Sequence, residues 1–151
     1  MNKLKRVSVR AIIFQDEKLV SMYRERDNRI FYTFPGGGKW DDETQEECVK
    51  REIFEETGLI IIPIKKVYIY ESETSIEYFY ICNYISGQIG TGQGPEYTSY
   101  KNNGFYKPML IEIAKIPTLP LMPPEIADIF YKDYIKNGQN LRDNVIHLLK
   151  Q

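Results

Sequence analysis

The sequence predicts an α/β protein whose mixed β-sheet is covered by helices on both faces. Segments rich in β-branched and aromatic residues recur along most of the chain. A Glu-rich segment with helical periodicity interrupts them at residues 44–57, and a second helical segment opens with Pro124. Several strands, one central helix and helices near the C-terminus together favour this layered architecture.

The order of elements follows from local patterns. Strands are predicted at residues 7–15, 18–24, 30–34, 60–70, 76–86 and 105–113. Helices are predicted at residues 44–57, 124–136 and 141–150. Asp16 and Glu17 join the first two strands into a hairpin, and residues 27–29 form a polar loop. Pro35 and the three glycines after it predict another loop, and residues 87–104 form the longest irregular stretch.

Length and composition limit the class of protein. The 151 residues, 42% hydrophobic and 27% charged, predict a single globular domain over residues 1–151. No apolar run is long enough to span a bilayer, and the basic N-terminus leads straight into a strand, so we expect a cytoplasmic protein. Two cysteines do not make a disulfide framework or a zinc site. The single His147, expected on the surface of the last helix, argues against histidine-based catalysis.

Charge is distributed unevenly although the net charge is −1. Bases outnumber acids in residues 1–29, and acids outnumber bases in residues 36–58. This asymmetry would suit a phosphate-bearing ligand held between basic and acidic elements, or it reflects scattered surface charges. No dense basic cluster is present, so nucleic acid is not an expected partner.

The Glu-rich helix carries the most specific pattern of the chain. It has the spacing G-x5-E-x7-R-E-U-x-E-E-x-G-U, where U is a bulky aliphatic residue. Every fixed position is filled, by Gly37, Glu43, Arg51, Glu52, Ile53, Glu55, Glu56, Gly58 and Leu59. On a helix Glu52, Glu55 and Glu56 converge on one face, beside an apolar strip that can pack on the domain. Three acids so placed repel one another unless a cation joins them, and Mg²⁺ or Mn²⁺ suits such hard oxygen ligands. The alternative is an ordinary solvated Glu-rich helix.

The pattern resembles the Nudix box, the signature of hydrolases that act on nucleoside diphosphates linked to another moiety. This resemblance implies an α/β/α sandwich over essentially the whole chain. It implies side-chain ligands to the metal from Glu52, Glu55 and Glu56 and a backbone carbonyl ligand from Gly36. It also implies that Arg51 pairs with Glu43, which fixes the loop to the helix.

The loop before the helix departs from the usual family pattern. Trp40 stands where a glutamate is common, and Asp42 replaces a glycine before Glu43. Asp42 can preserve the turn because aspartate tolerates left-handed backbone. Trp40 either stacks on a substrate base or packs on the helix.

A further acid from a loop beyond the box often acts as general base or extra metal ligand in this family. Residues 87–104 contain one acid, Glu96, which is our candidate for that role, and Glu52 is the rival. Glycines around Glu96 would let the loop fold over the metal.

The substrate is less well defined than the chemistry. The candidate phosphate contacts are Arg10, Arg24 and Arg26, with Arg24 the first choice. The candidate stacking residues are Tyr32, Phe34, Tyr97, Tyr100 and Tyr106, and Phe34 is better suited to the core. Nucleoside triphosphates and ADP-ribose-like nucleotide sugars are the expected substrates, and the protein would act as a monomer or a homodimer.

Two other function classes are compatible with the fold. A non-catalytic nucleotide-binding or sensing module would be expected to lose box carboxylates, and none is lost here. An RNA-processing enzyme fits poorly because no basic extension accompanies the domain.

Overall fold

The computed structural model describes residues 4–91 and 104–151 of the chain. The strands are β1 (Arg6–Gln15), β2 (Lys18–Arg26), β3 (Arg29–Thr33), β4 (Gly36–Gly38), β5 (Ile60–Glu71), β6 (Ser75–Ser86), β7 (Phe105–Glu112), β8 (Leu121–Met122) and β9 (Ile146–Leu149). The α-helices are α1 (Gln45–Thr57) and α2 (Pro124–Asn137). Two 3₁₀ helices, η2 (Ile113–Thr118) and η3 (Gly138–Asn140), flank α2 in the chain.

The strands form one mixed sheet in the order β8-β3-β2-β1-β6-β5-β9, with β4 added to β1 and β7 added to β2. The β1–β6, β3–β8 and β5–β9 pairs are parallel and the others are antiparallel. Strand β1 changes partners along its length: Ser8–Arg10 pairs with β4, whereas Phe14 and Gln15 pair with β2.

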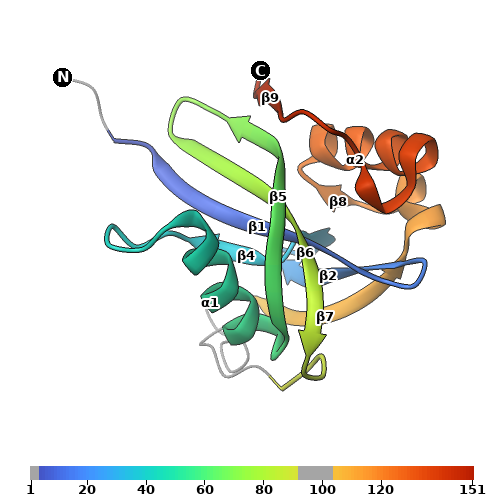
Figure 1. The fold of residues 1–151 in the computed structure, drawn as a ribbon. Helices are drawn as coiled ribbons and strands as arrows, with labels where there is room; N and C mark the ends of the chain where they lie inside the picture. The colour runs from blue at the N-terminus through green and yellow to red at the C-terminus, as the bar shows by residue number, and fades with distance from the viewer. Residues whose placement is uncertain (1–3, 92–103) are drawn as a thin grey trace.

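Alternation along β1 divides the core between the two faces of the sheet. Val9, Ala11 and Ile13 lie in the cluster that α1 covers, and Ile12 lies in the cluster that α2 covers. Figure 1 shows α1 and α2 on different sides of the sheet. Phe34 is 1% exposed and meets Phe79 and Phe130 edge to face, as expected for a core residue. The predicted α/β/α arrangement with a mixed sheet is therefore confirmed.

The C-terminal helix predicted at residues 141–150 is wrong. This segment contains β9, which pairs in parallel with β5 at Tyr68–Glu71, and the Lys150 N–H donates to the Glu71 carbonyl at 2.7 Å. The open edge of β5 offers backbone groups that the segment satisfies, and this tertiary pairing outweighs local helix propensity. His147 consequently lies on a strand rather than a helix, exposed, 2.7 Å from the Glu71 carboxylate.

The predicted loop of three glycines is also wrong, because Gly36–Gly38 is strand β4. A run of glycines has no strand preference of its own, but β1 supplies a partner for its backbone. The remaining predicted strands and the first two predicted helices are confirmed, with shifts of one or two residues at their ends. No helix in the described ranges is long and apolar enough to cross a membrane.

Candidate metal and pyrophosphate site

The helix that carries the box is fixed at both ends by its own sequence. The Thr44 hydroxyl accepts from the Glu47 N–H at 3.0 Å, and the Glu47 carboxylate accepts from the Thr44 N–H at 2.8 Å. This capping box opens α1. Gly58, with φ 81°, closes it by donating its N–H to the Phe54 carbonyl at 3.0 Å. Both ends therefore lie where the sequence places them.

Three carboxylates of α1 share the helix face that packs towards the sheet. Glu52 and Glu56 are buried, at 9% and 7% exposure, and Glu55 is partly buried. Cys48 on the same face is buried in the cluster under α1, whereas Phe54 on the outer face is exposed. The predicted helix face is thus the one that the structure buries.

Strand β4 lies directly against these carboxylates. The Gly36 N–H donates to Glu56 Oε1 at 2.7 Å. A Cβ at Gly37 would lie 2.5 Å from Cδ of Glu52, so Gly37 leaves the space that the Glu52 carboxylate fills. Gly36 has φ 147°, and a Cβ there would lie 2.1 Å from the Val9 carbonyl oxygen. The glycines therefore allow backbone and carboxylates to approach closely.

Arg51 links the carboxylates to the loop before the helix. Its Nε and Nη2 donate to the two oxygens of Glu43 at 3.1 and 2.7 Å, as the resemblance implies. Its Nη2 also donates to the Gly38 carbonyl at 3.0 Å. Its Nη1 donates to Glu52 Oε1 at 2.9 Å and to Glu55 Oε1 at 3.1 Å. This bidentate pair, chiefly through its hydrogen bonds, lowers the pKa of Glu43 to about 2 and raises the pKa of Arg51.

Trp40 packs on the helix through Arg51. The Arg51 Cζ lies 3.8 Å from the centre of a Trp40 ring, and Trp40 is 57% exposed. The Trp40 N–H donates to Glu43 Oε1 at 2.9 Å. The structure thus shows the packing contact that was one of the two predictions for this residue.

Arg24 lies on a row of aromatic residues across three strands. Its cross-strand neighbours are Phe31 and Tyr106, whose ring centres lie 5.5 and 4.2 Å from its Cζ. Its Nη2 donates to the Tyr106 hydroxyl at 2.6 Å, whereas its buried Nε has no hydrogen-bond partner among the described residues. Burial lowers the pKa of Arg24, and Arg10 and Glu56 are near enough to act on that pKa in opposite directions.

Arg10 on β1, the cross-strand partner of Gly36, contacts the backbone of β4. Its Nη1 donates to the Gly36 carbonyl at 3.2 Å and to the Phe34 carbonyl at 3.3 Å, and its Nε donates to Glu77 at 3.1 Å. Gly36 therefore has Glu56 at its N–H and Arg10 at its carbonyl. This arrangement brings the predicted Arg10, Gly36 and Glu56 together.

Other predicted site residues lie elsewhere. Tyr32 packs against the cluster under α2 and meets Tyr23 edge to face, with ring centres 5.7 Å apart. Arg26 is exposed at the end of β2, with its Nε 4.0 Å from a carboxylate oxygen of Asp27. Glu96, together with Tyr97 and Tyr100, lies outside the described residues.

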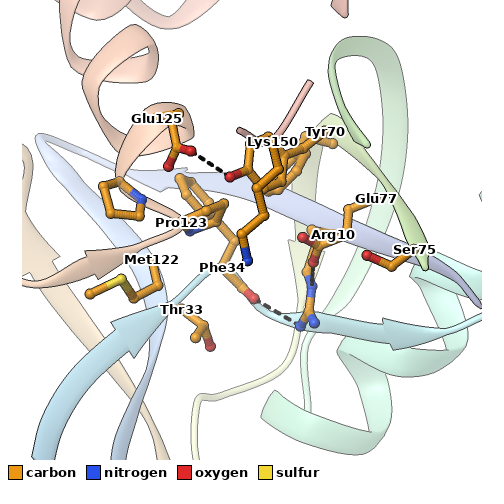
Figure 2. Close-up of a pocket in the computed structure, with 12 residues that line it drawn as sticks. Arg10, Thr33, Phe34, Tyr70, Ser75, Glu77, Met122, Pro123, Glu125 and Lys150 are labelled. Carbon is orange, nitrogen blue, oxygen red and sulfur yellow. Dashed lines mark hydrogen bonds and ion pairs between the residues drawn. The ribbon is translucent and has the colours of Figure 1, made fainter. Parts of the chain in front are cut away.

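A pocket next to Arg10 was not predicted. It has a volume of about 310 Å³, and Figure 2 shows Arg10, Glu77, Tyr70, Glu125 and Lys150 around it. The Tyr70 hydroxyl donates to Glu125 at 2.6 Å. This hydrogen bond lowers the pKa of Glu125. The pKa of Tyr70 is raised, first by burial and second by the same hydrogen bond. Five strands and the start of α2 contribute the pocket's lining, so no local sequence signal marks it.

The donor set of the α1 face fits a divalent cation. Its carboxylates and the Gly36 carbonyl are hard oxygen ligands, of the kind that Mg²⁺ and Mn²⁺ prefer. Within residues 4–91 and 104–151, no group of three His, Cys, Asp or Glu side chains is already arranged around one metal position. In this structure the carboxylate oxygens of this face accept hydrogen bonds from Arg51 and from the Gly36 N–H.

Several solved structures share the fold. A NUDIX hydrolase from Nitrosomonas europaea has a TM-score of 0.75 at 16% identity, covering 98% of this chain and 80% of its own. An ADP-ribose pyrophosphatase from Streptococcus suis has a TM-score of 0.64 at 17% identity, with coverages of 97% and 100%. A MutT protein from Methanosarcina mazei has a TM-score of 0.64 at 20% identity, with coverages of 91% and 98%.

Two sequence comparisons were informative in different ways. The comparison with curated proteins finds no match to this chain. The profile of the NUDIX domain matches residues 4–121, which include β1 to β7 and the whole box. The chain therefore belongs to the Nudix hydrolase family.

Proposed function

We propose that this Nudix hydrolase uses a divalent metal to cleave the pyrophosphate linkage of a nucleoside diphosphate derivative. The observation that carries the proposal is the close contact of Glu52 and Glu56 with the glycines of β4, with Glu55 beside them on the same face. A nucleoside triphosphate and a nucleotide sugar of the ADP-ribose type are the two substrate classes. The name of the ADP-ribose pyrophosphatase of the same fold supports the second class.

Mg²⁺ or Mn²⁺ would be held by the side chains of Glu52, Glu55 and Glu56 and by the Gly36 carbonyl. When bound, the ion lowers the pKa of a coordinated water and neutralises charge on the phosphate oxygens. Glu52 and Glu56 are buried one helical turn apart, with Glu55 beside them, and this concentration of negative charge favours a cation-binding role over a solvated surface.

Arg10 and Arg24 would bind the phosphates opposite the carboxylates. The guanidinium of Arg24 is held by the Tyr106 hydroxyl and by two ring faces, which fixes its direction before a substrate arrives. Because its Nε is buried, Arg24 would bind a phosphate through its terminal nitrogens. Arg10 contacts the Gly36 carbonyl and also lines the neighbouring pocket, so it would connect the phosphates with a group bound in that pocket.

We place the nucleoside, or the group attached to the second phosphate, in the pocket beside Arg10. Its volume of about 310 Å³ is at the lower end of the range for small-molecule sites. Phe34, Phe79 and Met122 offer apolar walls, and Glu125 and Lys150 offer polar groups at its border. Arg26 and Tyr32 are not needed in this arrangement.

The base that activates the water would be Glu96 or Glu52. Glu52 already lies among the proposed ligands, 2.9 Å from Nη1 of Arg51. Glu96 is proposed from its position in the sequence alone. A single domain over residues 1–151, a monomeric or homodimeric state and a cytoplasmic location also stay proposals from the sequence.

A panel of nucleoside triphosphates and nucleotide sugars tests the function, with kcat/KM for each compound and product identification by mass. We expect cleavage between the phosphates of at least one compound. Tight binding in calorimetry without any product across the panel would instead indicate a nucleotide-binding module.

A further inference from the structure

Trp40 covers the guanidinium on which the arrangement of the carboxylates depends. The Arg51 Cζ lies 3.8 Å from the centre of a Trp40 ring, a stacking distance. The side chains of Arg51 and Glu43 are only 17% and 9% exposed, although Trp40 itself is 57% exposed. The indole therefore lies between solvent and the Arg51 guanidinium.

Arg51 holds three carboxylates at once, so its own position determines theirs. Its Nε and Nη2 bind Glu43, and its Nη1 binds Glu52 and Glu55. An ion pair that water reaches is weak, whereas one shielded from water keeps a defined geometry. Removing the cover would let Arg51 leave the position in which it orients Glu52 and Glu55.

We propose that Trp40 is a positioning residue for the metal ligands, acting through its stack on Arg51. This inference rests on the proposed metal-dependent function. The main-chain N–H of Trp40 makes the bond to Glu43, so a side-chain substitution leaves that bond in place. Side-chain variants at position 40 therefore test the stacking of the indole on Arg51 and not the backbone hydrogen bond to Glu43.

The experiment measures Mn²⁺ binding to nucleotide-free protein by electron paramagnetic resonance, for wild type, Trp40→Phe and Trp40→Leu. Phe54→Leu is the matched control, because Phe54 is a 49% exposed aromatic residue on the outer face of α1. From the strength of cation–π contacts we expect Trp40→Leu to weaken the Mn²⁺ Kd about 3- to 30-fold. Trp40→Phe should recover most of the affinity, and Phe54→Leu should match wild type. In turnover, Trp40→Leu should lower kcat at fixed Mn²⁺ with little change in substrate KM.

The outcomes separate this inference from the proposed function. Wild-type Mn²⁺ affinity in Trp40→Leu would overturn the inference. A raised substrate KM with unchanged Mn²⁺ affinity would also overturn it, and would make Trp40 a substrate contact. Failure of the wild-type protein itself to bind Mn²⁺ would overturn the proposed function and the inference with it.

Discussion

Replacing Gly37 by alanine should displace the Glu52 carboxylate while the fold survives. A Cβ at this position would lie 2.5 Å from Cδ and from Oε2 of Glu52, and ordinary contact needs at least 3.4 Å. The carboxylate must therefore move by about 1 Å, and an error of that size at a reacting centre costs about 10²-fold in rate. The atoms that must move are the end of a flexible side chain, so we expect stability to change by less than about 1 kcal/mol.

Gly38→Ala is the matched control for this substitution. Gly38 is the next residue of β4, and a Cβ there meets nothing within 4 Å. The assay measures kcat/KM with the best substrate at saturating Mg²⁺, together with thermal unfolding of both variants. The reasoning predicts a loss of about 10²-fold for Gly37→Ala and a change of less than about threefold for Gly38→Ala. Equal activities in two folded variants would refute the placement of Glu52.

Four other substitutions test separate parts of the site. Glu55→Gln and Glu56→Gln should each remove most activity in a steady-state assay, and Mg²⁺ should raise the Tm of each variant less than that of wild type. For Glu43, whose pKa is lowered from 4.5 to about 2 by the hydrogen bonds from Arg51, the stabilising contribution is complete above pH 4.5 and is lost as pH falls towards 2. Urea unfolding at pH 5 and pH 3 should therefore show a smaller loss for Glu43→Gln than for wild type, and equal losses would contradict the assignment. Glu96→Gln should lower kcat by about 10²-fold with a modest change in KM, and an unchanged kcat would leave Glu52 as the base.

Local rules were sufficient to predict the box helix. Thr44 and Gly58 mark its ends, and the spacing of Glu52 and Glu56 predicts the buried face. Both signals lie within a few residues of the structure they determine, because capping and helical periodicity are short-range effects.

Longer-range pairing was not predictable in the same way. Residues 146–149 became a strand because β5 has an edge to pair with, and Gly36–Gly38 became a strand because β1 lies beside it. The pocket beside Arg10 draws residues as distant as Thr33 and Lys150, which only the completed fold brings together. Such contacts depend on which segments become neighbours and not on the composition of either one.

The position of Arg24 shows the limit for a single side chain. Its place at the end of a strand predicted a phosphate contact. Its neighbours Phe31 and Tyr106 follow from the register of β2 with β3 and β7. The register explains why the guanidinium is buried between rings and why its pKa is lowered. The sequence alone did not reveal this register.

The initial rate of pyrophosphate cleavage as a function of Mg²⁺ concentration tests the central claim most directly. The best substrate of the panel is incubated with wild-type protein, first in excess EDTA and then with increasing Mg²⁺, and the products are identified by mass. We predict no cleavage in EDTA, a rate that rises and saturates with Mg²⁺, and a nucleoside monophosphate among the products. Full activity in excess EDTA would contradict the account.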